Sequence, residues 1–153
     1  MKSLIVYFSW SNNTKKLVEE VNKSLKYDVL RIERKVPYSK DYNECAYVEA
    51  KNEVENRIYP EINDINIDLN NYSQILLFFP IWWYTFPMPI GSFIKKLSNY
   101  NGEVILFANS YTNDIEYMNN SYNDALNLNG NIKFKKGLFN KSANEHIEFI
   151  KKL

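Results

Sequence analysis

The opening stretch, residues 2–25, constrains the fold most, because it sets a strand, a polar turn and a helix in direct succession. Residues 2–8 (KSLIVYF) form a short apolar run that is rich in β-branched and aromatic residues, which predicts a strand. A polar turn, residues 9–14 (SWSNNT), follows, and then Leu17, Val18 and Val21 recur at helical spacing. In open sheets built from such units, ligands bind in the crevice at the carboxyl ends of the strands.

The rest of the chain repeats this alternation of strand and helix. Further strands are predicted at residues 27–33, 74–79, 103–108 and 131–135, and helices at 41–58, 89–97, 115–126 and 143–153. Residues 74–79 (QILLFF) are continuously apolar, as expected for a strand that is buried on both faces. We therefore predict one α/β domain, residues 1–153, with a five-stranded, mostly parallel sheet between two layers of helices.

The composition excludes several classes of function. The 153 residues carry a net charge of +1 and no basic stripe, so nothing favours nucleic acid as a partner. Cys45 and His146 are the only residues of their kinds, which excludes an intrachain disulfide, a zinc site and Cys–His catalysis. Segment 75–90 is apolar but too short to span a bilayer as a helix. We expect a cytoplasmic protein that does not use a membrane.

Several residues with reactive or charged side chains are expected to be structural. His146 should lie on the surface of the last helix, which a capping box of Ser142 and Glu145 begins. Cys45 should be a semi-buried filler, and Glu49, Glu53 and Glu55 should form a solvated helix face. The inner stripe of helix 41–58 is then expected to consist of Tyr42, Ala46, Ala50, Val54 and Ile58.

Three loops, residues 9–14, 80–88 and 109–114, each follow a predicted strand and should meet at one edge of the sheet. The first of them suits a phosphate. The hydroxyls of Ser9, Ser11 and Thr14, the Asn13 amide and the free N–H groups at the start of the helix can all donate to oxyanions. Taken alone, the same residues are also ordinary helix caps.

The tryptophans indicate what else the ligand carries. Trp10, Trp82 and Trp83 all fall in these loops, and Tyr84, Phe86 and Tyr111 add further rings. Aromatic side chains beside a phosphate site favour a ligand with a flat ring at one end and a phosphate at the other, a shape that FMN has. The alternative is that Trp82 and Trp83 form a packing corner or an oligomer contact.

The chain resembles a known family at these loops. The run from Tyr7 to Lys15 (YFSWSNNTK) and the later run from Phe79 to Trp83 (FPIWW) look like a flavodoxin, and residues 37–42 (PYSKDY) resemble a branch of short bacterial flavodoxin-like proteins. The resemblance implies sheet order 2-1-3-4-5 and an FMN cofactor. It also implies single-electron transfer between redox partner proteins, a reductase and an acceptor. The strand order comes from the resemblance and not from the hydrophobic pattern.

The chain departs from that family at three points. Asn12 stands where the phosphate loop usually has glycine, and asparagine is the residue that best tolerates positive φ there. The third loop, residues 109–113 (NSYTN), has no glycine, and the net charge is near zero rather than strongly acidic. Two alternatives therefore stay open: an FMN-dependent NAD(P)H oxidoreductase that resembles quinone reductases, and a flavodoxin-fold module that has lost FMN.

The expected site has a cofactor-binding role only, with no catalytic residue and no metal ligand. We expect a monomer or a weak dimer. The residues expected to contact FMN are Ser9, Trp10, Ser11, Asn12, Asn13, Thr14, Pro80, Ile81, Trp82, Trp83, Tyr84, Asn109, Ser110 and Tyr111.

Overall fold

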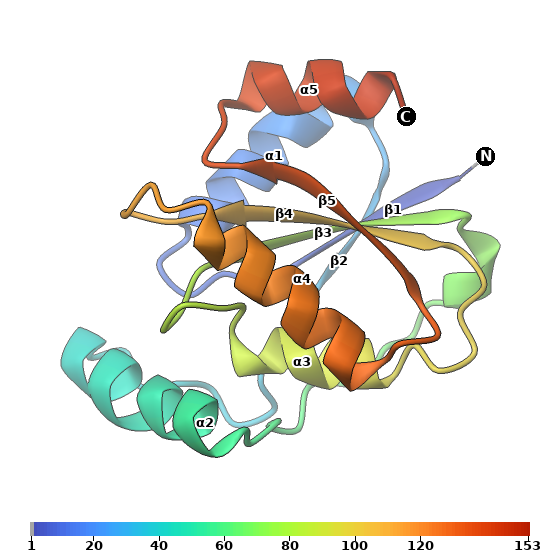
Figure 1. Ribbon diagram of the computed structural model, residues 1–153. Coiled ribbons are helices and arrows are strands. Elements are labelled where there is room, and N and C mark those ends of the chain that lie inside the picture. The colour runs from blue at the N-terminus through green and yellow to red at the C-terminus, as the bar shows by residue number, and fades with distance from the viewer. Residues whose placement is uncertain (1) are drawn as a thin grey trace.

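The computed structural model describes residues 2–153, and its centre is a five-stranded parallel sheet in the order β2-β1-β3-β4-β5 (Figure 1). This order confirms the expectation drawn from the resemblance. The three inner strands are almost wholly buried, as their continuous apolar runs require. The strands are β1 (Ser3–Tyr7), β2 (Asp28–Arg31), β3 (Gln74–Pro80), β4 (Glu103–Asn109) and β5 (Lys133–Phe139).

Helices cover both faces of the sheet (Figure 1). One layer consists of α1 (Asn13–Leu25) and α5 (Ala143–Lys151), which pack on alternate strand residues such as Leu76 and Phe78. The other layer contains α3 (Met88–Lys95) and α4 (Glu116–Leu128), which pack on Leu77 and Phe79. The π-helix η1 (Glu44–Ala50) continues into α2 (Lys51–Asn56) on this second side, and a 3₁₀ turn, η2 (Leu69–Asn71), precedes β3. Within residues 2–153, no helix combines the length and apolarity needed to cross a membrane.

The last strand lies further along the chain than the predicted residues 131–135. β5 spans Lys133–Phe139 and forms one edge of the sheet, where its lysines face solvent and hide the apolar pattern. Glu103 of β4 forms ion pairs with Lys133 and Lys135, with N···O distances of 2.8 and 3.2 Å. The neighbouring strand therefore supplies the partners that these lysines need, which a local pattern cannot reveal.

The predicted inner stripe of helix 41–58 is correct only in part, since Ala50 is buried and Val54 packs against the core. Tyr42 and Ile58 are exposed, and the residues buried in this segment are Cys45, Ala50 and Glu53. The cause is the π-helical turn, because its wider winding rotates the face that a 3.6-residue period assigns to the core. Glu53 is not on a solvated face: it is 4% exposed and its Oε2 lies 3.4 Å from Arg34 Nη2.

The expectation that His146 lies on the surface is also wrong. Its ring is buried between Phe78 and Phe107, with ring centroids 5.6 Å from each, and its Nδ1 lies 2.7 Å from the Ser142 carbonyl oxygen. Burial lowers the pKa of His146, because the charged imidazolium is disfavoured away from water. The capping box of Ser142 and Glu145 is confirmed at the start of α5.

Candidate functional site

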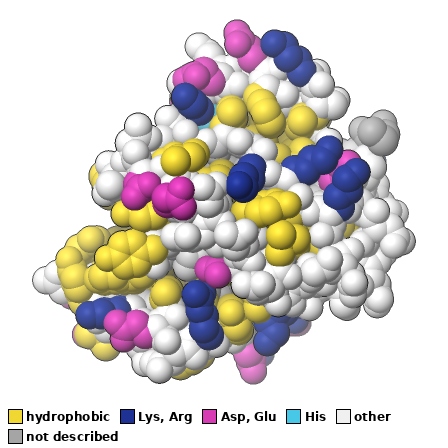
Figure 2. Space-filling model, viewed as in Figure 1, with side chains coloured by type: hydrophobic (Ala, Val, Ile, Leu, Met, Phe, Trp, Pro, Cys, Tyr) yellow, Lys and Arg dark blue, Asp and Glu magenta, His cyan; other side chains and the backbone are white. Residues whose placement is uncertain are grey.

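The loops that follow β1, β3 and β4 enclose a cavity of about 620 Å³ at the carboxyl ends of the strands. Of the expected contact residues, all but Ser9, Asn12 and Thr14 line it. Figure 2 shows hydrophobic side chains gathered on this face, over η1 and the loop after β3. The lining residues are Trp10, Ser11, Asn13, Tyr42, Cys45, Ala46, Tyr47, Ala50, Pro80, Ile81, Trp82, Trp83, Tyr84, Asn109, Ser110, Tyr111, Thr112 and Tyr117.

The first loop presents the open N-terminus of α1 to the cavity. Asn12 is the N-cap residue with φ 71° and ψ 2°, the left-handed conformation for which asparagine was expected to be tolerated, and its side chain makes no capping hydrogen bond. The Lys15 amide donates to Ser9 Oγ, and the Lys16 amide donates to the Asn12 carbonyl. In the described part of the chain, the amides of Asn13 and Thr14 have no acceptor. They are free to bind an anion.

Two of the hydroxyls expected to face a phosphate have partners within the protein. Ser9 is buried and accepts the Lys15 amide at 3.2 Å. Thr14 is 1% exposed, and its hydroxyl donates to Asn109 Oδ1 at 3.0 Å, which joins the first loop to the third. Ser11 and Asn13 therefore remain as the polar side chains of this loop that line the cavity.

The second loop contains a strained turn. Trp82 and Thr85 exchange backbone hydrogen bonds of 2.8 and 3.5 Å, and the two residues between them, Trp83 and Tyr84, have φ values of 51° and 75°. Non-glycine residues with such backbone angles cost about 1–3 kcal/mol each and persist only where the surroundings hold them. Here Asn120 Nδ2 of α4 donates to the Tyr84 carbonyl at 3.1 Å. A contact from α4, outside the turn, therefore helps to hold its backbone conformation.

One side of the cavity is formed by Trp10, Tyr42, Tyr47 and Trp83, here called the aromatic wall. Its rings contact one another in sequence, with centroid distances of 6.1 Å for Trp10–Tyr42, 6.2 Å for Tyr42–Tyr47 and 5.4 Å for Tyr47–Trp83. Trp82 turns inward and packs edge-on against Phe8, 5.2 Å away. Trp10 and Trp83 therefore belong to the wall, whereas Trp82 lines the cavity while it packs against the core.

Sequence reasoning missed the contribution of segment 42–50 to the site. Tyr42 and Tyr47 belong to the wall, and the small residues Cys45, Ala46 and Ala50 line the cavity beside them. The signal that could have found this surface is Tyr47, a large aromatic residue outside the predicted inner stripe of the helix. Such rings, more than half exposed, are typical of a binding surface.

The third loop lines the cavity, but its aromatic ring points into solvent. Tyr111 lines the rim, yet its side chain is 97% exposed and its hydroxyl is only within 3.5 Å of Asn13 Nδ2. The Ser110 amide donates to Asn140 Oδ1 at 2.6 Å, which holds the loop to the end of β5. The Tyr111 ring, which was expected to add to the aromatic side chains of the site, therefore lies mostly in solvent.

The cavity is electrically neutral, since none of its lining residues carries a formal charge at pH 7. Burial raises the pKa of Cys45 to about 12, so its thiol stays protonated and is a poor nucleophile. Among residues 2–153, no three His, Cys, Asp or Glu side chains are close enough to hold a metal ion. The arrangement can bind a flat, uncharged ring beside an anion.

Comparison with known proteins agrees with this geometry. A family model described as Flavodoxin matches residues 2–152. The chain belongs to the flavodoxin family. Among solved structures, this flavodoxin-family chain is similar to a flavoprotein from Lactobacillus acidophilus NCFM in complex with FMN, with 26% identity, a TM-score of 0.80, and coverage of 97% of this chain and 98% of that one.

Two further structures are similar over nearly their whole length. The apo-form of the Lactobacillus acidophilus NCFM flavoprotein shares 28% identity, with a TM-score of 0.70 and coverage of 94% and 95%. A Bacteroides eggerthii DSM 20697 protein shares 22% identity, with a TM-score of 0.83 and coverage of 98% and 96%, a likeness of fold. No curated protein matches the chain.

Proposed function

We propose that this flavodoxin-family protein binds FMN and passes single electrons between redox partner proteins. One observation carries the proposal: an open helix N-terminus and an aromatic wall lie at the same cavity. Its volume of about 620 Å³ is within the usual range for a small-molecule site. The FMN complex of the similar Lactobacillus acidophilus flavoprotein supports the same cofactor here.

The residues present fit the phosphate end of FMN. The free amides of Asn13 and Thr14, with the positive end of the α1 dipole, would hold a phosphate without any cationic side chain. The hydroxyl of Ser11 and the side-chain amide of Asn13 line the cavity beside them and would add donors. The phosphate would therefore be bound by dipoles and hydrogen bonds alone.

The residues present also fit the ring end. Trp10, Tyr42, Tyr47 and Trp83 offer flat apolar surface, and the small side chains of Cys45, Ala46 and Ala50 leave room beside them. Bound FMN supplies one-electron redox chemistry. The lining residues carry no formal charge that would offset negative charge on the ring, so they would disfavour a reduction step that adds a negative charge to it.

The same lining supports a carrier over a catalyst. An FMN-dependent reductase needs a place for its second substrate, and NAD(P)H carries a pyrophosphate that arginine or lysine side chains commonly bind. Among residues 2–153, no lysine or arginine lines the cavity, although Lys51 Nζ lies 5.5 Å from the centroid of the Trp83 ring. A carrier needs only an exposed ring edge near its partners. We propose a reductase and an acceptor protein as those partners.

The test begins with purified protein reconstituted with FMN and then desalted. Retained flavin absorbance is expected, and its absence would show that the fold has lost FMN. Ser11→Ala should weaken the binding of FMN but not of riboflavin, which has no phosphate. An equal loss for both ligands would contradict the phosphate assignment.

The second measurement separates carrier from reductase. The FMN-loaded protein alone should oxidise almost no NADH or NADPH in the presence of a soluble quinone. After chemical reduction, it should pass electrons to a one-electron acceptor such as cytochrome c. Sustained NAD(P)H turnover by the protein alone would reject the carrier proposal and favour the oxidoreductase.

A further inference from the structure

Both tryptophans of the aromatic wall are tied to one short stretch of the chain. Trp10 Nε1 donates to the Ser39 carbonyl at 3.1 Å, and Trp83 Nε1 donates to the Ala46 carbonyl at 2.7 Å. The two rings come from the loops after β1 and β3, whereas both acceptors lie between β2 and α2. Because an indole has a single N–H donor, the position of each acceptor sets the orientation of its ring.

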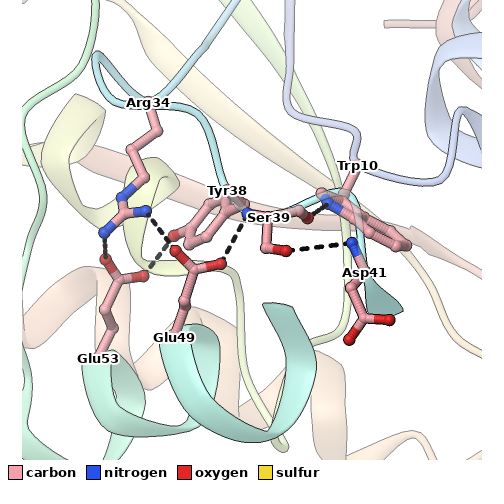
Figure 3. A network of polar contacts seen from close by, with 7 residues as sticks. All are labelled: Trp10, Arg34, Tyr38, Ser39, Asp41, Glu49 and Glu53. Carbon is pink, nitrogen blue, oxygen red and sulfur yellow. Dashed lines mark hydrogen bonds and ion pairs between the residues drawn. The ribbon is translucent and has the colours of Figure 1, made fainter. Parts of the chain in front are cut away.

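A cluster of charged residues holds that stretch in place (Figure 3). Arg34 Nη1 lies 3.3 Å from Glu49 Oε2, and Arg34 Nη2 lies 3.4 Å from Glu53 Oε2. The guanidinium also lies over the Tyr38 ring, 4.3 Å from its centroid, and the Tyr38 hydroxyl donates to Glu53. Glu53 is buried, so leaving its carboxylate without Arg34 would be costly.

Glu49 connects this cluster to the wall. Its Oε2 faces Arg34, and its Oε1 accepts the Ser39 amide at 2.7 Å. The carbonyl of the same Ser39 accepts the Trp10 indole N–H. A path of one ion pair and two hydrogen bonds therefore runs from Arg34 through Glu49 and Ser39 to Trp10, as Figure 3 shows.

We infer that Glu49, oriented by Arg34, is a positioning residue that fixes the Trp10 side of the aromatic wall before FMN binds. This inference rests on the proposed function, from which it takes FMN as the ligand. Glu49 does not line the cavity, so it acts only through Ser39 and Trp10. Charge-assisted hydrogen bonds are short and directional, and a wall that is ordered in advance spares the ligand the cost of ordering it.

The first test needs no flavin. In ¹⁵N-labelled apo protein, Glu49→Ala should raise the solvent exchange rate of the Trp10 indole N–H about tenfold or more, because the Ser39 carbonyl is released. Glu49→Gln should restore much of the protection, since its amide oxygen can still accept the Ser39 N–H. Glu44→Ala is the matched control, on the same helix with an exposed side chain, and should leave exchange unchanged. Unchanged Trp10 exchange in Glu49→Ala would overturn the inference.

The second test uses both flavins. Glu49→Ala should raise Kd for FMN and for riboflavin by the same factor, roughly tenfold, as expected when a supporting residue is removed. The losses are equal because Glu49 acts on the ring end and not on the phosphate. A loss confined to FMN would overturn the inference. If wild-type protein binds neither flavin, the proposed function fails, while the exchange experiment still decides whether Glu49 positions Trp10.

If Glu49→Ala does not fold, a double-mutant cycle with milder variants replaces the flavin-binding test. Trp10→Phe keeps a ring but removes the N–H that donates to Ser39. Glu49→Asp, whose shorter side chain cannot reach both Arg34 and the Ser39 amide, should then weaken riboflavin binding in the wild-type background and have no further effect in the Trp10→Phe background. Losses that add across the two backgrounds would show that Glu49 does not act through the indole.

Discussion

Asn12 tests whether backbone conformation or side-chain chemistry shapes the first loop. Its φ of 71° and ψ of 2° are left-handed, and its side chain makes no capping hydrogen bond. An ordinary L-residue costs roughly 1–2 kcal/mol in this conformation and asparagine less, so Asn12→Ala should lower the free energy of unfolding by about 1 kcal/mol. Asn12→Gly relieves the same strain, but glycine loses more backbone entropy on folding, which costs about 0.5–1 kcal/mol. The free energy of unfolding of Asn12→Gly should therefore stay within about 0.5 kcal/mol of the wild-type value.

Urea unfolding of the three proteins, followed by circular dichroism, measures this difference. For a domain of this size, 1 kcal/mol corresponds to about 2–4 °C in Tm, so a thermal scan gives an independent check. The expected order of stability places glycine and asparagine together, with alanine below. Equal stability of Asn12→Ala and wild type would refute the argument from strain. If glycine were less stable than alanine, conformational strain would not be the property that matters at this position.

Three further outcomes follow from other contacts. Thr14→Val removes the hydroxyl that donates to Asn109 and should cost about 1 kcal/mol in urea unfolding, whereas Thr14→Ser should keep most of the stability. The lowered pKa of His146 means that the unfolded chain binds a proton below about pH 6.5 that the folded chain does not. The free energy of unfolding should therefore fall as the pH is lowered from 7 to 5.5, and it should fall less steeply in His146→Leu. Parallel pH profiles of the two proteins would contradict this. A Cβ at Gly102 would lie 2.5 Å from the Ser73 carbonyl oxygen and against the Tyr100 hydroxyl, so Gly102→Ala should cost about 2 kcal/mol or more, whereas Gly130→Ala, where the nearest atom is 3.4 Å away, should be nearly neutral.

Local sequence patterns were sufficient to predict the fold class of the protein. The apolar run of β3 and the strand–turn–helix at the start predicted an α/β sheet, because a strand buried on both faces must be apolar along its whole length. The loops at the carboxyl ends could be named in advance for the same reason, since parallel strands bring their ends to one edge. Asn12 was expected to tolerate positive φ, and it does.

Only the tertiary structure decided what surrounds those loops. His146 and Glu53 are polar residues that the sequence places on helix surfaces, yet both are buried because a distant element supplies their environment: two phenylalanine rings of the sheet for His146, and Arg34 for Glu53. The π-helical turn of η1 rotated a face that a regular period had assigned to the core.

The aromatic wall shows the same division. The sequence by itself placed Trp10 and Trp83 in loops beside a phosphate-binding turn. That Tyr42 and Tyr47 complete the wall, and that Ser39 and Ala46 orient the two indoles, depends on contacts between residues 29 and 37 positions apart. No local periodicity records such contacts, because they form only when the chain folds and brings the segment after β2 against the ends of β1 and β3.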